Sequence, residues 1–236
     1  MYYSNYGSTD LVLTILILVA FVFSFWAQAK VKGTYEKYSK NRTHRGLTGA
    51  EAARVILDKN DLRDVPVIQV EGTLTDYYDP TKRLVALGEH EHDSTSPVAI
   101  GVAAHECGHA IQYKNNYLPA KVRLAIIPAC SIGSKLSIPM IIVGILLSGL
   151  IPIAYYLVYI GIILFGLVVL VELITLPTEF DASNRALKAI DACGILTEEE
   201  RAQAKEVLIA AALTYVAALA VSLLQLLRLI LRSRKD

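Results

Sequence analysis

The stretch LSIPMIIVGILLSGLIPIAYYLVYIGIILFGLVVLV, residues 136–171, carries no charged side chain. An α-helix rises about 1.5 Å per residue, so about 20 apolar residues cross a bilayer and this stretch is too long for one ordinary span. Gly149 and Pro152 interrupt it near its middle. Because both residue types favour turns, the stretch predicts two membrane helices, at about 136–151 and 154–174, joined by a tight turn. It indicates an integral membrane protein.

Two further apolar segments lie near the ends of the sequence, at residues 11–29 and 207–227. The first could be a cleaved signal peptide, but no Lys or Arg precedes it and no clear small-residue cleavage site follows it. We therefore expect a retained transmembrane helix. The second continues a helix that begins near Thr197, where Thr197 and Glu200 have the spacing of a capping box.

Composition excludes several classes of protein. Of 236 residues, 54% are apolar, and 23 basic residues nearly balance 22 acidic ones. A net charge of +1 gives no basic footprint for nucleic acid, and the apolar excess excludes an acidic disordered chain. Three cysteines are too few for a secreted domain held together by disulfides.

The distribution of basic residues predicts the orientation in the membrane. Residues 1–10 contain no Lys or Arg, whereas six basic residues follow the first apolar segment closely. They are Lys30, Lys32, Lys37, Lys40, Arg42 and Arg45. By the positive-inside rule, residues 30 to about 123 are cytoplasmic, and residues 175–206 return to that side. The bases at 228–235 oppose this rule if the last helix crosses. Either that helix crosses against the rule, which its hydrophobicity favours, or it packs half-buried without crossing.

The polar part of the chain predicts a small α+β domain. We expect helices at 47–60 and from Ser96 to about 115, and strands at 65–71 and 83–88. Residues 72–80 are rich in turn formers, and Glu89 to Asp93 form a polar loop.

The second of these helices contains His105-Glu106-Cys107-Gly108-His109. Histidines at i and i+4 lie on one helical face, so both imidazoles can reach one metal ion, and Glu106 can serve as general base. A zinc ion lowers the pKa of a bound water and polarises the scissile carbonyl. The triplet could be a coincidence on a structural helix. The helix is otherwise small and apolar, however, and buried polar groups need partners.

A catalytic zinc site needs a third protein ligand and an open position. The candidates are His90, His92, Glu172, Glu179 and Asp181. The two histidines lie in a polar loop, and Glu172 falls at the end of a membrane helix. Glu179 lies just after Pro177, at the start of a predicted helix over 178–190.

Several segments together resemble a known family, the YugP-type neutral zinc metallopeptidases of bacterial membranes. They are Leu74–Pro80, Gly101–Gln112, Leu176–Ser183, Arg185–Leu187 and Ala211–Ala217. The Glu-Phe-x-Ala element at Glu179 is also similar to the third-ligand helix of the HtpX-like membrane proteases, a gluzincin group. This resemblance implies that Glu179 is the third zinc ligand and that the fold is a gluzincin-like minidomain on a membrane bundle. Ser183 stands where an Asp is usual, so Asp181 or another group would hold the ligand histidine.

Four other predictions concern residues around this site. Arg185 could bind a substrate carbonyl or carboxylate, or form a surface ion pair. Tyr215 could donate to the oxyanion, or pack at the membrane interface. Cys107 is expected to be a buried packing residue, like Cys130 and Cys193. By the family geometry, the strand at 84–88 could bind substrate as an added strand.

The sequence thus predicts a mainly α membrane protein with about four hydrophobic helices and a small α+β gluzincin-like HExxH metallopeptidase domain. Its expected function is a zinc endopeptidase of the bacterial cytoplasmic membrane, with one Zn²⁺ held by His105, His109 and Glu179 and with Glu106 as base. Its partners would be the lipid bilayer and a peptide or membrane-protein substrate. The alternatives are a non-enzymatic scaffold or regulatory protein with a structural zinc, in which Cys107 or His90 is a fourth ligand, and a transporter. A transporter predicts ionisable residues within the spans, and residues 136–171 have none.

The predicted organisation has five parts: a membrane anchor at 1–29, a cytoplasmic metallopeptidase part at 30–135, a membrane hairpin at 136–174, a cytoplasmic third-ligand helix at 175–206 and a C-terminal hydrophobic helix at 207–236.

Overall fold

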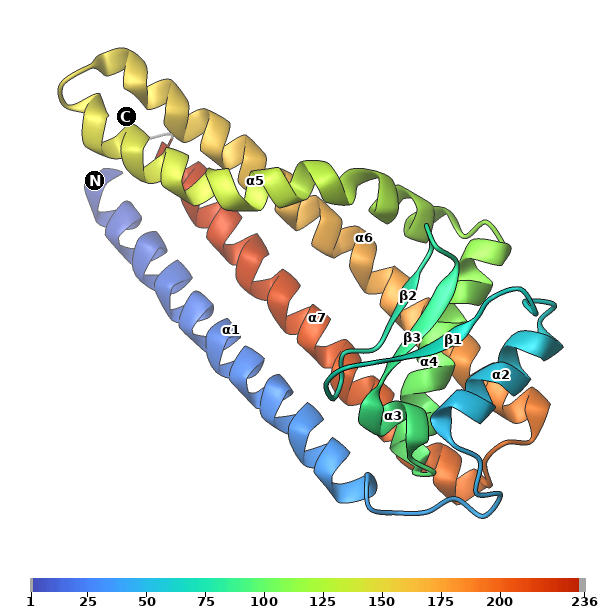
Figure 1. The fold of residues 1–236 in the computed structure, drawn as a ribbon. Coiled ribbons are helices and arrows are strands. Elements are labelled where there is room, and N and C mark those ends of the chain that lie inside the picture. The colour runs from blue at the N-terminus through green and yellow to red at the C-terminus, as the bar shows by residue number, and fades with distance from the viewer. Residues whose placement is uncertain (1, 234–236) are drawn as a thin grey trace. The chain divides into compact units, whose positions relative to one another are not determined.

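The computed structural model describes residues 2–233, with side chains from residue 10 onward. Helices dominate the chain, and one small sheet lies between the second and third helices of the sequence (Figure 1). The elements are α1 (Tyr2–Tyr38), α2 (Gly49–Lys59), β1 (Val67–Val70), β2 (Tyr77–Asp79), β3 (Leu84–Gly88), α3 (Glu89–Asp93), α4 (Pro97–Lys114), α5 (Leu118–Ser148), a 3-10 turn at Pro152–Tyr155, α6 (Tyr156–Cys193) and α7 (Glu198–Ser233).

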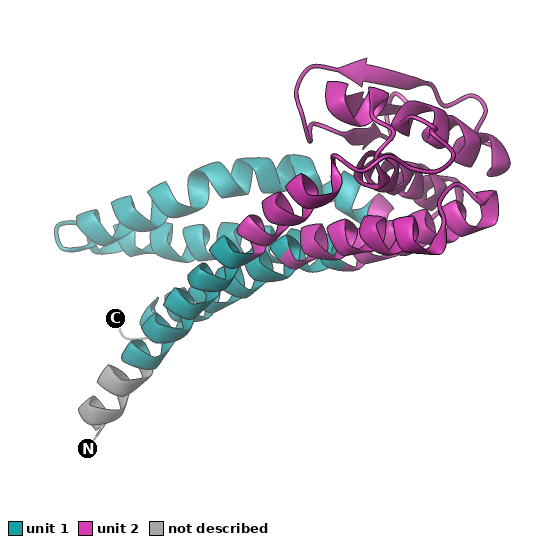
Figure 2. Cartoon of the chain, turned by 90° about the horizontal axis from the view of Figure 1, so that it is seen from below, with its two compact units in different colours: residues 1–26, 122–176, 214–236 teal, residues 27–121, 177–213 magenta. Residues whose placement is uncertain are grey.

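The chain forms two compact units, shown in two colours in Figure 2. Residues 1–26, 122–176 and 214–236 form the first, called here the apolar unit. Residues 27–121 and 177–213 form the second, called here the sheet unit. Helices α1, α5, α6 and α7 each contribute residues to both units.

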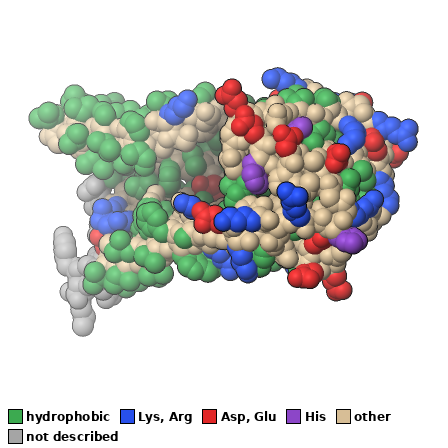
Figure 3. All heavy atoms as spheres, turned by 60° about the horizontal axis from the view of Figure 1, so that its bottom comes forward, with side chains coloured by type: hydrophobic (Ala, Val, Ile, Leu, Met, Phe, Trp, Pro, Cys, Tyr) green, Lys and Arg blue, Asp and Glu red, His purple; other side chains and the backbone are tan. Residues whose placement is uncertain are grey.

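Among the described residues, four helices are long and apolar enough to cross a membrane: Asp10–Tyr38, Leu118–Ser148, Pro152–Cys193 and Glu198–Ser233. Large apolar side chains stand exposed along them, and Phe25 and Leu146 are 70% and 71% exposed. Green hydrophobic side chains cover much of the surface of these helices in Figure 3. Apolar surface of this extent is typical of a bilayer-facing protein. The predicted fold class, a mainly α membrane protein with four hydrophobic helices and a small sheet, is confirmed.

The hairpin of the apolar unit turns where the sequence predicts, between Ser148 and Pro152. Its two helices are longer than predicted, because α5 begins at Leu118 and α6 runs to Cys193. The prediction that a new helix starts after Pro177 is wrong, since Pro177 lies inside the continuous helix α6. Proline removes one helical hydrogen bond but does not end a helix that is packed on both sides of it.

Opposite charges meet at one end of the apolar unit. Asp10 accepts hydrogen bonds from Arg228 at 3.3 Å and from Arg232 at 2.8 Å. The hydroxyl of Tyr155, beside the hairpin turn, donates to the carbonyl of Ser233 at 3.2 Å. The end of α7 therefore lies beside the first charged residue of α1 and beside the hairpin turn. Asp10 supplies a counter-charge for Arg228 and Arg232, two of the C-terminal bases that oppose the positive-inside rule. The other two, Arg234 and Lys235, lie outside the described residues.

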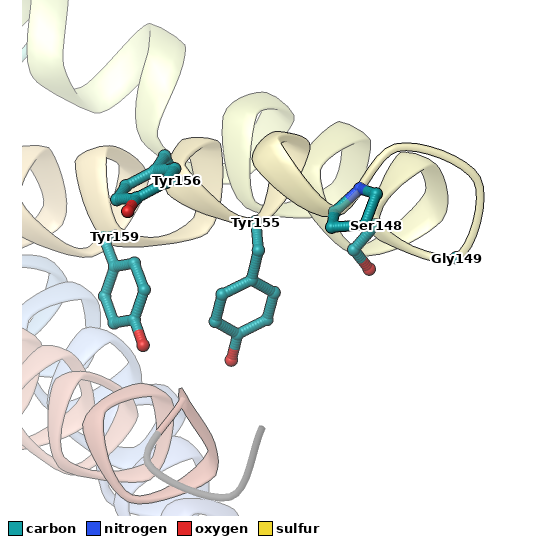
Figure 4. A pocket seen from close by; sticks show the side chains of 6 residues that line it. Ser148, Gly149, Tyr155, Tyr156 and Tyr159 are labelled. Atoms are coloured by element: carbon teal, nitrogen blue, oxygen red, sulfur yellow. The ribbon is translucent and has the colours of Figure 1, made fainter.

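A pocket of about 550 Å³ also lies at the hairpin turn (Figure 4). Its lining consists of tyrosines and turn residues: Ser148, Gly149, Pro152, Tyr155, Tyr156 and Tyr159. The ring centroids of Tyr155 and Tyr159 are 5.2 Å apart in an edge-on arrangement. Tyrosines at the ends of membrane helices are typical of the bilayer interface.

The sheet unit is built around a three-stranded sheet with the order β1-β3-β2. Strand β3 pairs with β1 in parallel and with β2 antiparallel, so it is the central strand. The expectation that β3 accepts an added substrate strand is therefore wrong, because both of its edges are already paired. Strand β2 was missed in a segment expected to be turns, since three residues are too few to show alternation.

One mixed core joins the sheet to the helices of this unit. Buried side chains of β3 and α4 pack with those of α2 and with the parts of α6 and α7 that belong to the unit. The capping box predicted at Thr48 and Glu51 begins α2. The loop expected at Glu89 to Asp93 is the short helix α3, whose Glu91 is fully buried and accepts hydrogen bonds from the Tyr35 hydroxyl and the Leu74 amide.

Candidate metal centre

Helix α4 carries the two motif histidines through the core of the sheet unit. Ser96 caps the helix by accepting from the amide of Ala99, and Pro97 occupies its first turn, as the sequence predicts. The His105 and His109 side chains are 16% and 12% exposed. Their ring centroids lie 4.8 Å apart, which confirms that both share one face of the helix.

Helix α6 brings Glu179 to this face. Glu179 Oε2 lies 3.2 Å from His105 Nε2 and 3.6 Å from His109 Nε2, and the residue is 3% exposed. All three donor atoms lie within 4.8 Å of one another. The structure thus brings together the three residues that the motif and the family resemblance predict as ligands, across about 70 residues of sequence.

The donor set suits zinc in both chemistry and spacing. Two imidazoles and one carboxylate form a common catalytic zinc set, with a fourth position left for water or substrate. Ligand atoms about 2.0–2.2 Å from a tetrahedral zinc ion lie about 3.3–3.6 Å from one another. The two distances from Glu179 Oε2 lie close to this range. The residues present therefore fit a zinc ion.

Gly108 allows α4 and α6 to approach closely at this level. A Cβ atom at position 108 would lie 2.3 Å from the carbonyl oxygen of Ala182. Ala182 is one turn from Glu179 on α6, so the absence of a side chain at position 108 allows the close separation of the two helices that carry the three donors. The glycine of the motif has a packing role that its spacing alone does not reveal.

We expect Gly108→Ala to destabilise the protein by about 1–3 kcal/mol, because overpacking forces the backbone of α6 away. Zinc binding should weaken in parallel, since the donors on the two helices separate. Thermal unfolding and zinc content of the purified protein measure both effects. Gly166→Ala is the matched control, because nothing lies within 4 Å of a Cβ at that position of α6. A Gly108→Ala protein as stable as the native one would contradict this account.

The other ligand candidates make different contacts. His90 Nδ1 lies 2.9 Å from the Tyr35 hydroxyl, and His92 bonds Asp93. Glu172 belongs to the apolar unit, where Ser222 donates to it. Cys107 is fully buried, with its thiol directed at the carbonyl of Ala53, and burial raises its pKa. Among the described residues, the group of possible metal ligands therefore consists of His105, His109 and Glu179. It does not include Cys107 or His90, which the structural-zinc alternative names as a fourth ligand.

Glu106 occupies a buried, acidic part of the site and is 8% exposed. Burial and the charges of Glu91 and Glu106 raise the pKa of Asp76 to about 7. Asp76 Oδ1 accepts from the Gly88 amide at 2.9 Å, while its buried Oδ2 accepts no hydrogen bond from the described residues. Burial opposes protonation of His109, but hydrogen bonding to Glu179 and the charges of Glu106 and Glu179 outweigh it and raise its pKa. The carboxylates of Glu106 and Glu179 thus favour positive charge at His109.

Two polar residues hold the ring nitrogens that face away from Glu179. His105 Nδ1 lies 3.1 Å from Ser183 Oγ, and His109 Nδ1 lies 3.0 Å from Gln112 Oε1. Ser183 thus contacts a motif histidine directly, the role that was predicted for Asp181 or another group. Gln112 was missed, although its position three residues after His109 on the same helix face was a usable signal.

Two further residues, Arg185 and Tyr215, were predicted to act at the site. Arg185 donates to Asp181, and its guanidinium lies 5.5 Å from the centre of the Tyr117 ring. The ion pair that the sequence left as an alternative for Arg185 is therefore present. Tyr215 belongs to the apolar unit and is 37% exposed. Cys130 is buried and Cys193 half-buried, and both are free thiols like Cys107.

Comparison with known proteins agrees with this geometry. Residues 13–234 match the sequence model of a family described as "Putative neutral zinc metallopeptidase". The chain is 48% identical over 216 residues to "Putative membrane protease YugP" of Bacillus subtilis (strain 168), covering 92% of this chain and 94% of that protein. No solved structure matches the chain significantly. The chain therefore belongs to the neutral zinc metallopeptidase family, whose model it matches over nearly its whole length.

Proposed function

We propose that this peptidase is a zinc-dependent endopeptidase of the bacterial cytoplasmic membrane, with its active site on the cytoplasmic side near the bilayer. One zinc ion would be held by His105, His109 and Glu179. The observation that carries the proposal is the convergence of one donor atom each from His105, His109 and Glu179 within 4.8 Å in the sheet unit.

The bound ion would polarise the scissile carbonyl and lower the pKa of the attacking water. Glu106 follows His105 directly and is nearly buried, so its carboxylate is poorly solvated and available as a base. It would take a proton from the attacking water and pass that proton to the leaving nitrogen. Burial and the charges of Glu91 and Glu106 raise the pKa of Asp76 to about 7, so this carboxyl group would be about half protonated at neutral pH.

The substrate would bind in an extended form along β2. Strand β2 is an edge strand of the sheet, with β3 on its only paired side among the described strands. It also lies close to the motif helix, because the rings of Tyr78 on β2 and Tyr113 on α4 are 5.7 Å apart. An extended peptide can add to such an edge through main-chain hydrogen bonds. This replaces β3 with β2 as the proposed substrate-binding strand.

Tyr215 remains a proposed donor to the oxyanion, on the basis of its place in the Ala211–Ala217 segment shared with the family resemblance. For Arg185, the ion pair with Asp181 favours a supporting role over direct contact with substrate.

The orientation rests on the bases that follow the first apolar segment. Lys32, Lys37 and Arg45 belong to the sheet unit, which also contains the three donors. Because such bases favour the cytoplasmic side, the site would face the cytoplasm. The substrates would then be membrane proteins or segments close to the membrane.

Membrane vesicles of opposite orientation test this proposal in one assay. We expect casein added outside to be cleaved by inverted vesicles, which expose the cytoplasmic face, and not by sealed right-side-out vesicles. A chelator should abolish cleavage, and about one equivalent of zinc per chain should restore it, because a single donor group binds the ion. Vesicles containing Glu106→Gln are the control. Cleavage confined to right-side-out vesicles would overturn the orientation, and cleavage insensitive to chelation would overturn the zinc mechanism.

A further inference from the structure

Gln112 connects a proposed metal ligand to polar groups on another helix. It is fully buried on α4, and its amide makes three hydrogen bonds. Nε2 donates to the carbonyl oxygen of Thr178 at 2.7 Å and to Asp181 Oδ2 at 2.9 Å, while Oε1 faces His109 Nδ1 at 3.0 Å. Beyond it, Arg185 pairs with Asp181 and stands over the ring of Tyr117. A continuous polar chain therefore runs from His109 to Arg185.

The partners of Gln112 determine which way its amide points. The carbonyl of Thr178 can only accept a hydrogen bond, and Oδ2 of Asp181 accepts from both Gln112 and Arg185. The amide nitrogen must face them, which leaves the amide oxygen facing His109 Nδ1. An amide oxygen carries no proton, so Nδ1 must donate. A neutral His109 then has its lone pair on Nε2, the atom directed toward Glu179.

His105 lacks such a constraint. Its Nδ1 lies 3.1 Å from the hydroxyl of Ser183, which can either donate or accept. The two histidines of the motif therefore differ: the partner of His109 fixes its tautomer, whereas the partner of His105 permits both. This asymmetry is decided by residue type at positions 112 and 183.

We infer that Gln112 is a positioning residue that fixes the Nδ1–H tautomer of His109, and that Asp181 and Arg185 hold Gln112 in the amide orientation that does so. The inference rests on the proposed function, because it takes His109 as a metal ligand. Its consequence is a ring whose Nε2 is ready to bind zinc without rearrangement. The carboxylate of Asp181 does not contact the His109 ring itself. It accepts a hydrogen bond from the Gln112 amide, which contacts the ring, and Arg185 is its counter-ion.

The decisive variant is Gln112→Met, which keeps the length of the side chain and removes its hydrogen bonds. We expect zinc affinity, measured on the full chain in detergent by competition with a chromogenic chelator, to fall by about 10–100-fold, the usual effect of losing a partner of a ligand histidine. In the metal-free protein, at an alkaline pH at which the imidazoles are neutral, ¹⁵N spectra of labelled histidines should show one His109 tautomer in the native chain and a mixture of both in the variant. A merely structural role would not change the tautomer.

Gln69→Met is the matched control, because Gln69 also donates to an aspartate, Asp93, but on the exposed side of β1. It should leave zinc affinity and the histidine spectra unchanged. Asp181→Leu removes one of the two acceptors that orient Gln112, so it should weaken zinc binding less than Gln112→Met does. If Gln112→Met does not fold, Asp181→Leu serves as the test in its place. The inference then requires that Asp181→Leu reduce the preference of His109 for its native tautomer.

Three results would overturn the inference. The first is a folded Gln112→Met protein with native zinc affinity and one His109 tautomer. The second is a larger loss of zinc affinity in Asp181→Leu than in Gln112→Met, because Asp181 would then act independently of Gln112. The third is native zinc affinity in His109→Ala, which would remove the ligand assignment and the proposed function with it. A native site that needs His109 but tolerates Gln112→Met overturns this inference alone.

Discussion

Replacing Glu106 by Gln is expected to lower kcat by about 10²- to 10⁴-fold while leaving zinc content at the native level, because general acid–base catalysis contributes about that much. At about 1.36 kcal/mol per tenfold change, this corresponds to roughly 3–5 kcal/mol of lost transition-state stabilisation. The amide has nearly the shape of the carboxylate, so it fits the same buried position. It can neither take a proton from the attacking water nor return one to the leaving nitrogen.

The measurement combines casein cleavage with zinc analysis on the same purified samples. Glu71→Gln is a suitable control, because Glu71 is an exposed residue that follows β1 in the same unit. It should leave both quantities unchanged. Native cleavage by Glu106→Gln would exclude Glu106 as the base, whereas loss of zinc from this variant would assign it a structural role at the site.

Replacing Glu179 by Ala is expected to weaken zinc binding by at least about 100-fold, more than the loss of a residue that only supports a ligand. Glu179 is the one anionic donor of the proposed set, and its carboxylate lies within 3.2–3.6 Å of both imidazoles. Without it, two neutral rings remain for a divalent cation. Proteolysis should disappear with the metal, and a large excess of zinc should not restore the native rate.

The control for this variant lies on the same helix. Glu172 is two turns earlier on α6, and Ser222 of the apolar unit donates to it. Glu172→Ala should therefore keep its zinc. Full zinc retention by Glu179→Ala would exclude Glu179 as a ligand without bearing on Glu106. Loss of zinc from both variants at once would indicate a general disruption of α6.

Local features of the sequence predicted many of the elements that frame the site. The Ser96-Pro97 start and the Thr48–Glu51 capping box mark real helix beginnings, because capping needs residues only three positions apart. The turn near Gly149 was also predicted, because the preference of Gly and Pro for turns is a local property of the chain. Strand β2 and helix α3 were missed, since elements of three and five residues carry too little periodicity.

The error at Pro177 has a different cause. Proline lacks an N–H, so on local grounds a helix boundary is the best prediction for this position. In the structure α6 continues, and the side chains of Thr175 and Thr178 on either side are buried. Packing of the flanking turns compensates for one missing hydrogen bond, and no local rule measures that packing.

By itself, the sequence determined that this protein has four membrane-competent helices and a helix with His105 and His109 on one face, because uncharged length and i, i+4 spacing are local properties. Only the tertiary structure decided three other features: the approach of Glu179 to the imidazoles, the three-way bonding of Gln112, and the pairing of Asp10 with Arg228 and Arg232. Each of these includes contacts between residues about 65 to more than 200 positions apart. Such contacts form only when α1, α4, α6 and α7 pack, and packing depends on the whole set of apolar faces rather than on any one segment.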